Sequence, residues 1–250
     1  MNKWIEKARG GDVSAMEYLI DKYREIGNEK EAAYWQAYRD AADSAIASMN
    51  RLSEIAETAE AAMALGLFDA AEEGFERALP ICRELLKIEN GADCYFPDSE
   101  RENVQKTYRT LSRDYAAVVY FQYEDHARVI QMLEEADCTD GESLTVIGAS
   151  CYRLRRMSDA FRALNAAYAE REYLSPDSAD WRQTAFAEGM RFLSILYRDG
   201  SAPDGEKHPE KAIEVLKNAL RALTDEDAIH TILSELNRYH KECSGSYQYA

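Results

Sequence analysis

The stretch LTVIGASCYRLRRMSDAFRALNAA, residues 144–167, decides the fold class. Its apolar residues recur three and four positions apart, which is the spacing of one face of an α-helix. Gly148, Ala160 and Ala167 are small residues at places where two paired helices would cross closely, while Leu164 fills the layer between them. The stretch therefore predicts a helical hairpin, with helices near 142–155 and 157–171.

Small residues recur in the same pattern at three other places in the chain. These copies comprise Gly66, Phe68, Ala71, Phe75 and Ala78; Val129, Leu133 and Ala136; and Ala212, Leu216 and Ala219. One hairpin cannot bury both of its faces, so each copy needs neighbours stacked against it. Such an array offers a surface that binds another molecule rather than a pocket for chemistry.

The spacing of these residues resembles that of a known repeat family. Leu144, Ile147, Gly148, Ala160, Leu164 and Ala167 are spaced as in a tetratricopeptide repeat, and 66–79 resembles the second half of one. The N-terminal part and 187–219 resemble the related Sel-one-like repeat. The residues that carry this second resemblance are Ala8, Gly11, Ala15, Leu19, Tyr23, Gly27, Ala32 and Trp35, then Leu193, Tyr197, Gly200, Lys211, Ala212 and Ala219.

The resemblance covers most of residues 3–220 and implies an all-α superhelix, or solenoid, of about five hairpins with a C-terminal capping helix. The closing alanines Ala78, Ala136, Ala167 and Ala219 are unevenly spaced, so the array is irregular. A nonrepetitive helical bundle is the alternative. We expect one domain over 1–243, with 90–99 as an alternative point of subdivision, and a flexible tail over 244–250.

Helix boundaries follow from capping residues, glycine and proline. Residues 28–65 contain no glycine or proline and are expected to form two helices with a break within 43–51, or else one long helix. Pro80 is expected to kink or restart its helix, because proline removes a backbone hydrogen bond. Ser99 is a candidate N-cap for the helix after it. Asp12 or Ser14 is expected to cap the helix that ends before Gly27, and Thr224 or Asp225 is expected to cap the final helix, which ends near Glu242. The other helices are expected near 2–9, 100–123, 125–136, 179–198 and 209–223, with one more that begins near Phe68.

Composition and charge exclude several classes of function. The chain is 46% hydrophobic and carries a net charge of −16, which opposes binding to nucleic acid and to anionic membranes. It has no apolar run long enough for a membrane span, and its first residues lack the apolar core of a secretory signal. The five cysteines match no zinc or redox spacing, so buried reduced thiols and a cytoplasmic location are expected.

No motif in the sequence supports catalysis. The four histidines form no recognised metal motif, and His240 and Cys243 would supply only two ligands. Gly148–Tyr152 lacks the closing glycine and the preceding strand of a nucleophile elbow. We therefore expect no enzyme activity, no cofactor and no metal.

Arginines gather beside the best repeat copy, at Arg153, Arg155, Arg156 and Arg162. They either favour the helix C-terminus and pair with nearby acids, or clamp a carboxylate. The resemblance implies that the first helix of each hairpin lines a concave groove, acidic at its N-terminal end and rich in arginine at its C-terminal end. The implied groove residues are Glu17, Asp21, Arg24, Glu60, Asp114, Gln122, Glu142, Thr145, Tyr152, Arg153, Arg156, Glu188, Arg191 and Arg198.

These observations predict a scaffold or adaptor that binds a peptide or helical segment of a partner protein in that groove. A peptide-sensing regulator is the alternative within binding proteins. A helical enzyme or metal protein, and an acidic mimic of nucleic acid, are the alternatives from other classes.

Overall fold

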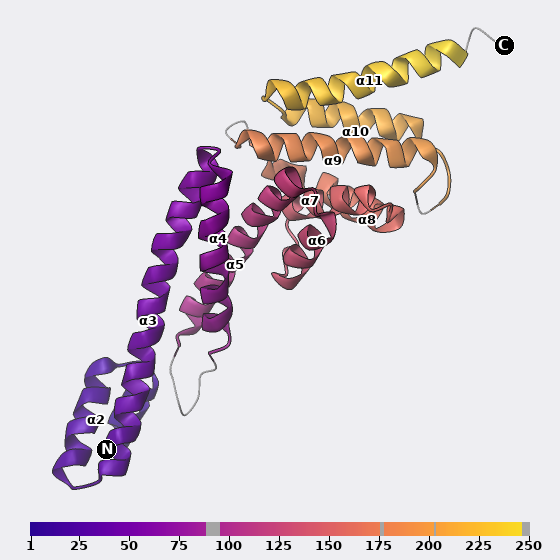
Figure 1. The fold of residues 1–250 in the computed structure, drawn as a ribbon. Helices are drawn as coiled ribbons and strands as arrows, with labels where there is room; N and C mark the ends of the chain where they lie inside the picture. Colours follow the sequence, from indigo (N-terminus) through magenta and orange to yellow (C-terminus); the bar gives the residue numbers. More distant parts are fainter. Residues whose placement is uncertain (89–95, 176–177, 203, 247–250) are drawn as a thin grey trace. The chain divides into compact units, whose positions relative to one another are not determined.

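The computed structural model describes residues 1–88, 96–175, 178–202 and 204–246. Within these ranges the chain forms eleven α-helices, one π-helical segment and one 3-10 helix, with no strand (Figure 1). The prediction of an all-α fold is confirmed. Most of the loop expected at 90–99 lies outside the described residues, as do 247–250 of the expected tail. Residues 244–246 of that tail are helical instead.

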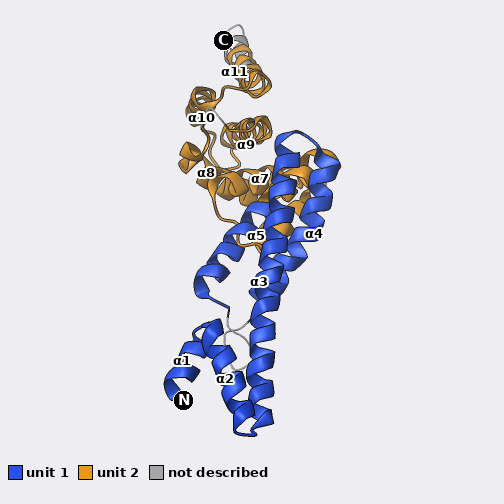
Figure 2. Ribbon diagram, turned by 90° about the vertical axis from the view of Figure 1, so that its left-hand side faces the viewer, with its two compact units in different colours: residues 1–112 blue, residues 113–250 orange. Residues whose placement is uncertain are grey.

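The chain divides into two compact units, Met1–Ser112 and Arg113–Ala250 (Figure 2). The boundary falls inside helix α5 (Asp98–Val118) and not in the segment 90–99. Each unit is described by itself.

Unit 1 begins with three helices around an aromatic core. Helix α1 (Asn2–Arg9) packs against α2 (Val13–Glu25), and α2 packs against α3 (Glu29–Ala64). Asp12 caps α2, as expected, by accepting a hydrogen bond of 3.0 Å from the Ala15 N–H. The buried residues of this core are Ala8, Ala15, Met16, Leu19, Ile20, Trp35 and Tyr38.

Helix α3 runs unbroken for 36 residues, so the break expected within 43–51 is wrong and the alternative of one long helix holds (Figure 1). The segment has no glycine or proline and is rich in alanine, the strongest helix former. Both ends of α3 are also held by packing, the first part against α2 and the last part against α4 (Phe68–Leu86). Tertiary contacts on both sides therefore keep the middle helical.

Helix α4 continues through Pro80, so a restart at this residue is wrong. Pro80 is exposed, and water can satisfy the carbonyl group that loses its N–H donor. Ser99 is not an N-cap, because α5 already begins at Asp98. The carbonyl oxygen of Pro97 accepts the first hydrogen bonds of the helix, from the N–H groups of Glu100 and Arg101 at 3.0 Å.

Unit 2 holds the end of α5 and the remaining helices. The helix expected over 100–123 changes at Val119 into a π-helical segment, η1 (Val119–Tyr123), which ends at Glu124 in a left-handed conformation. The helices that follow η1 are α6 (His126–Glu135), α7 (Gly141–Arg153), α8 (Met157–Ala169), α9 (Asp180–Asp199), α10 (Pro209–Ala222) and α11 (Glu226–Ser246).

Two glycines set the close packing around α7. A Cβ atom on Gly148 would lie 2.5 Å from Leu164 Cγ, so only glycine lets α8 approach α7 this closely. A Cβ on Gly189 of α9 would lie 2.7 Å from Thr145 Cγ2 of α7. The small-residue role predicted for Gly148 is therefore confirmed, and Gly189 does the same for α9.

Candidate functional site

The fourteen predicted groove residues divide between the two units. Those in unit 1 are Glu17, Asp21, Arg24 and Glu60, and all four are exposed. Glu17 lies 3.9 Å from Arg39, and Arg24 donates a long hydrogen bond of 3.5 Å to Gln36. The other ten residues belong to unit 2, where the structure brings several of them into direct contact.

Four charged side chains form an ion cluster in unit 2, with two buried carboxylates and two partly exposed arginines: Asp114 and Arg113 of α5, Glu142 of α7 and Arg182 of α9. Arg113 Nε lies 3.2 Å from Asp114 Oδ1 and 3.3 Å from Glu142 Oε1. Arg182 Nε lies 3.0 Å from the same Glu142 oxygen, but neither atom has an aligned hydrogen bond. The cluster links three helices through charge, with imperfect hydrogen-bond geometry.

Burial dominates the protonation of the two carboxylates in the ion cluster. Desolvation raises the pKa of Glu142 to about 7, even though Arg113 and Arg182 oppose the change. Desolvation also raises the pKa of Asp114 against the attraction of the same arginines. Asp140 adds a smaller repulsion to both. Asp114 and Glu142, predicted as groove contacts, are therefore internal groups of the fold.

A second group, the arginine–aromatic cluster, comprises Tyr152, Arg153, Glu188, Arg191 and Phe192. The Tyr152 and Phe192 rings stack with centroids 4.1 Å apart and an interplanar angle of 13°. The guanidinium carbons of Arg153 and Arg191 lie 5.2 Å and 4.9 Å from the Phe192 centroid. Phe192 is only 3% exposed. Its ring thus makes cation–π contacts with both guanidinium groups.

Glu188 neutralises part of this cluster. Its carboxylate accepts a hydrogen bond from Arg153 and lies 3.9 Å from Arg191 Nη2. It also accepts a 2.6 Å hydrogen bond from the Tyr120 hydroxyl, which η1 positions. Burial and the Glu188 charge both raise the pKa of Tyr120. Desolvation, followed by the Arg153 charge, lowers the pKa of nearby His126.

The remaining arginines mostly pair within their own helices or neighbours. Arg156 and Arg162 both bind Asp159, which fits the interpretation that these arginines pair with nearby acids. Arg198 pairs with Asp199 at 2.6 Å and lies 4.0 Å from Glu235. These pairs leave Arg156 and Arg198 outside the arginine–aromatic cluster.

Two further groove predictions have separate outcomes. Thr145 is buried, and its hydroxyl donates to the Gly141 carbonyl at 2.8 Å and contacts the Tyr173 hydroxyl at 3.0 Å. Its groove role is therefore wrong, because α9 covers this face of α7 at Gly189. Gln122 is exposed in η1.

Sequence reasoning missed Arg113, Arg182, Tyr120 and Phe192. A signal for two of them was present in the spacing. Glu142 and Arg182, like Tyr152 and Phe192, are forty positions apart along the chain (142 to 182, 152 to 192). Aligning α7 with α9 at a constant offset of forty positions would have predicted both contacts, Glu142 with Arg182 and Tyr152 with Phe192.

The described residues offer little to a covalent or metal mechanism. In the part of the chain that the structure describes, no three His, Cys, Asp or Glu side chains are grouped to hold a metal ion. Cys82, Cys138 and Cys151 are buried free thiols. Burial raises the pKa of Cys82 to about 12, which keeps its thiol protonated and unreactive.

Comparison with models of protein families, with curated proteins and with solved structures found no match to this chain. In the described parts of the chain, no helix is both long and apolar enough to cross a bilayer.

Proposed function

We propose that unit 2 is a short helical-repeat solenoid that binds an acidic peptide segment of a partner protein at the arginine–aromatic cluster. The repeat interpretation rests on local packing: α7 packs against α8 and α9, and α9 packs against α10 and α11. Gly148 and Gly189 occupy the close crossings that a stacked hairpin needs.

The single observation that carries the binding proposal is that the Arg191 side chain is partly exposed and only weakly paired with a carboxylate. Its guanidinium stacks on Phe192, its side chain is 34% exposed, and its nearest carboxylate oxygen lies 3.9 Å away. Its Nε has no hydrogen-bond partner among the described residues. A ligand carboxylate that reaches the exposed part of this side chain would gain a charge-assisted hydrogen bond from the guanidinium group.

The charge of the arginine–aromatic cluster supports the same ligand. Two guanidinium groups face one carboxylate, Glu188, which leaves one positive charge in excess. Arginine and tyrosine are also the residue types that contribute most often to binding energy in protein interfaces. An aspartate or glutamate side chain, or a C-terminal carboxylate, fits this site.

A defined peptide tests the proposal. The probe is the fluorescein-labelled peptide alanine–leucine–glutamate–glutamate–leucine–alanine, with a free or an amidated C-terminus, followed by fluorescence anisotropy. We expect a Kd of about 100 µM or lower, weakened at least ~10-fold by Arg191→Glu. The matched control is Arg221→Glu, an exposed arginine of α10 in the same unit.

The glutamine version of the peptide and Arg191→Lys sharpen the result. Lysine keeps the charge but loses the planar fork, so intermediate binding is expected. Equal binding of the glutamate and glutamine peptides, or equal weakening by Arg191→Glu and Arg221→Glu, would show that the proposal is wrong.

We also propose a reducing compartment such as the cytoplasm. The support is that Cys82, Cys138 and Cys151 are all buried as free thiols.

A further inference from the structure

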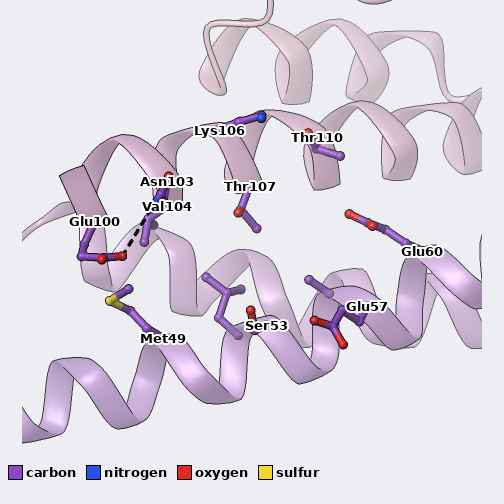
Figure 3. Close-up of a pocket in the computed structure, with 12 residues that line it drawn as sticks. Met49, Ser53, Glu57, Glu60, Glu100, Asn103, Val104, Lys106, Thr107 and Thr110 are labelled. Atoms are coloured by element: carbon purple, nitrogen blue, oxygen red, sulfur yellow. Dashed lines mark hydrogen bonds between the residues drawn. The ribbon is translucent and has the colours of Figure 1, made fainter.

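Unit 1 contains a cleft that none of the preceding argument uses. It lies between α3 and α5, and its volume is about 480 Å³ (Figure 3). This volume lies within the range of ~300–1,000 Å³ that is typical of ligand sites. All of its lining residues belong to unit 1, so it is separate from the arginine–aromatic cluster.

The floor of the cleft is apolar. Leu52 and Ala56 of α3 and Val104 of α5 are 3%, 6% and 2% exposed, and Met49 lies toward one end (Figure 3). Met49, Leu52 and Ala56 lie at successive turns of α3, so the apolar strip follows the axis of this helix. An apolar portion of a ligand would lose contact with water here, which is favourable.

The rim of the cleft is acidic. Glu57 and Glu60 of α3 lie toward one end, and Glu100 of α5 lies toward the other end, near Met49 (Figure 3). Glu100 accepts a 3.4 Å hydrogen bond from Asn103. The one basic residue of the lining, Lys106, extends on the side of α5 turned away from α3 (Figure 3). Glu57 and Glu100 lie toward opposite ends of the cleft, so each end is complementary to a cation.

The length of the cleft defines the spacing of the cationic groups. Met49, which lies near Glu100, and Glu57 are eight positions apart on α3, which corresponds to about 12 Å of helix. The first and last Cα atoms of an extended five-residue peptide are about 13 Å apart. A segment with a basic residue at each end and apolar residues between them would match the floor and both ends of the rim.

We propose that this acidic cleft is a second binding site, which takes a short extended peptide segment of a partner protein with lysine or arginine at both ends of an apolar stretch. Its apolar residues lie on Leu52, Ala56 and Val104. Its cations pair with Glu100 at one end and with Glu57 at the other.

The test uses the fluorescein-labelled pentapeptide lysine–leucine–alanine–leucine–lysine and the full chain. We expect fluorescence anisotropy to give a Kd of about 100 µM or lower. The double variant Glu57→Lys with Glu100→Lys should weaken binding at least ~10-fold, because it replaces attraction by repulsion at both ends. The matched control is Glu54→Lys with Glu102→Lys, which changes exposed residues of the same two helices outside the cleft.

A second variant tests the cleft without changing its charge, and it remains informative if the double variant does not fold. Ser53→Trp places a large side chain in the cleft from an exposed position of α3 and should also abolish binding. Arg191→Glu should leave binding unchanged, so failure here and failure of the unit 2 proposal are distinguishable.

Several outcomes would overturn the proposal. These are no binding of the pentapeptide, equal weakening by the two double variants, unchanged binding by Ser53→Trp, or equal affinity for a version with serine in place of both leucines. Displacement of the pentapeptide by spermidine with the same affinity would also overturn it, since the cleft would then be a site for a small amine.

Discussion

Replacing Glu142 by glutamine should remove a large part of the pH dependence of the stability of unit 2. Glu142 has only 10% of its side chain exposed, and burial raises its pKa from 4.5 to about 7. Between these two values the folded state binds a proton that the unfolded state has released. The free energy of unfolding should therefore fall as the pH rises from about 4.5 to about 7.

The magnitude follows from the same two values. They differ by about 2.5 pH units, and each unit corresponds to about 1.4 kcal/mol, so Glu142 contributes about 3 kcal/mol to the change. An ordinary salt-bridged carboxylate makes the folded state more stable as the pH rises. Glu142 has the opposite effect, because desolvation raises its pKa by more than the charges of Arg113 and Arg182 lower it. The raised pKa of Asp114 adds a contribution of the same sign.

The assay is urea unfolding at pH 5 and pH 8, measured by hydrogen exchange and mass spectrometry on peptides from α7 and α9. This measurement reports on unit 2 separately from unit 1. The wild-type free energy of unfolding should be about 3 kcal/mol lower at pH 8 through Glu142, and Glu142→Gln should remove this difference. Glu214→Gln, at an exposed position of α10, is the control. Equal pH dependence in wild type and Glu142→Gln would refute the reasoning.

Three substitutions test the packing directly, each by urea unfolding. Ala47→Pro, at an exposed position in the middle of α3, should cost about 3 kcal/mol because the helix is continuous there, whereas tolerance would indicate a break. Pro80→Ala should stabilise α4 by up to ~3 kcal/mol, and a loss of stability would contradict this. Gly148→Ala should destabilise unit 2 by about 1–3 kcal/mol, because its Cβ would overlap the buried Leu164; an unchanged midpoint would show that Leu164 gives way.

Local chemistry explains which parts of the fold were predictable. Asp12 was one of two candidate caps for α2, and Asp225 was one of two for α11; both accept the expected backbone N–H groups. These bonds join residues three positions apart, so the sequence alone contains the whole interaction. The same holds for Gly148, whose role depends on its missing side chain.

The failures involve contacts between distant segments. Nothing within 43–51 indicates that packing at both ends of α3 keeps its middle helical. Nothing near Pro80 indicates that its side of α4 is exposed. In both cases a weak local preference lost to tertiary structure, which local propensity does not describe.

The candidate site shows the same division. The register implied by the resemblance placed Arg153, Glu188 and Arg191 on one surface, and they do lie together. It did not indicate that Arg153 and Glu188 bind each other, or that Phe192 supports the guanidinium groups, because both contacts join α7 to α9. The sequence therefore overestimated the number of unpaired arginines, because Arg153, Arg156 and Arg198 pair with carboxylates of the fold.

Salt provides the last distinction between the two proposed sites, because the whole chain carries a net charge of −16. A basic peptide is attracted both by the acidic cleft and by this net charge, so its binding to unit 1 should weaken steeply as NaCl screens both attractions. An acidic peptide is attracted by Arg191 but repelled by the chain as a whole, and salt screens these effects in opposite directions. Its affinity should change several-fold less between about 0.05 M and about 0.5 M NaCl. Titrating both probes across this range measures the two slopes, and equal slopes would contradict the local charge assigned to at least one site.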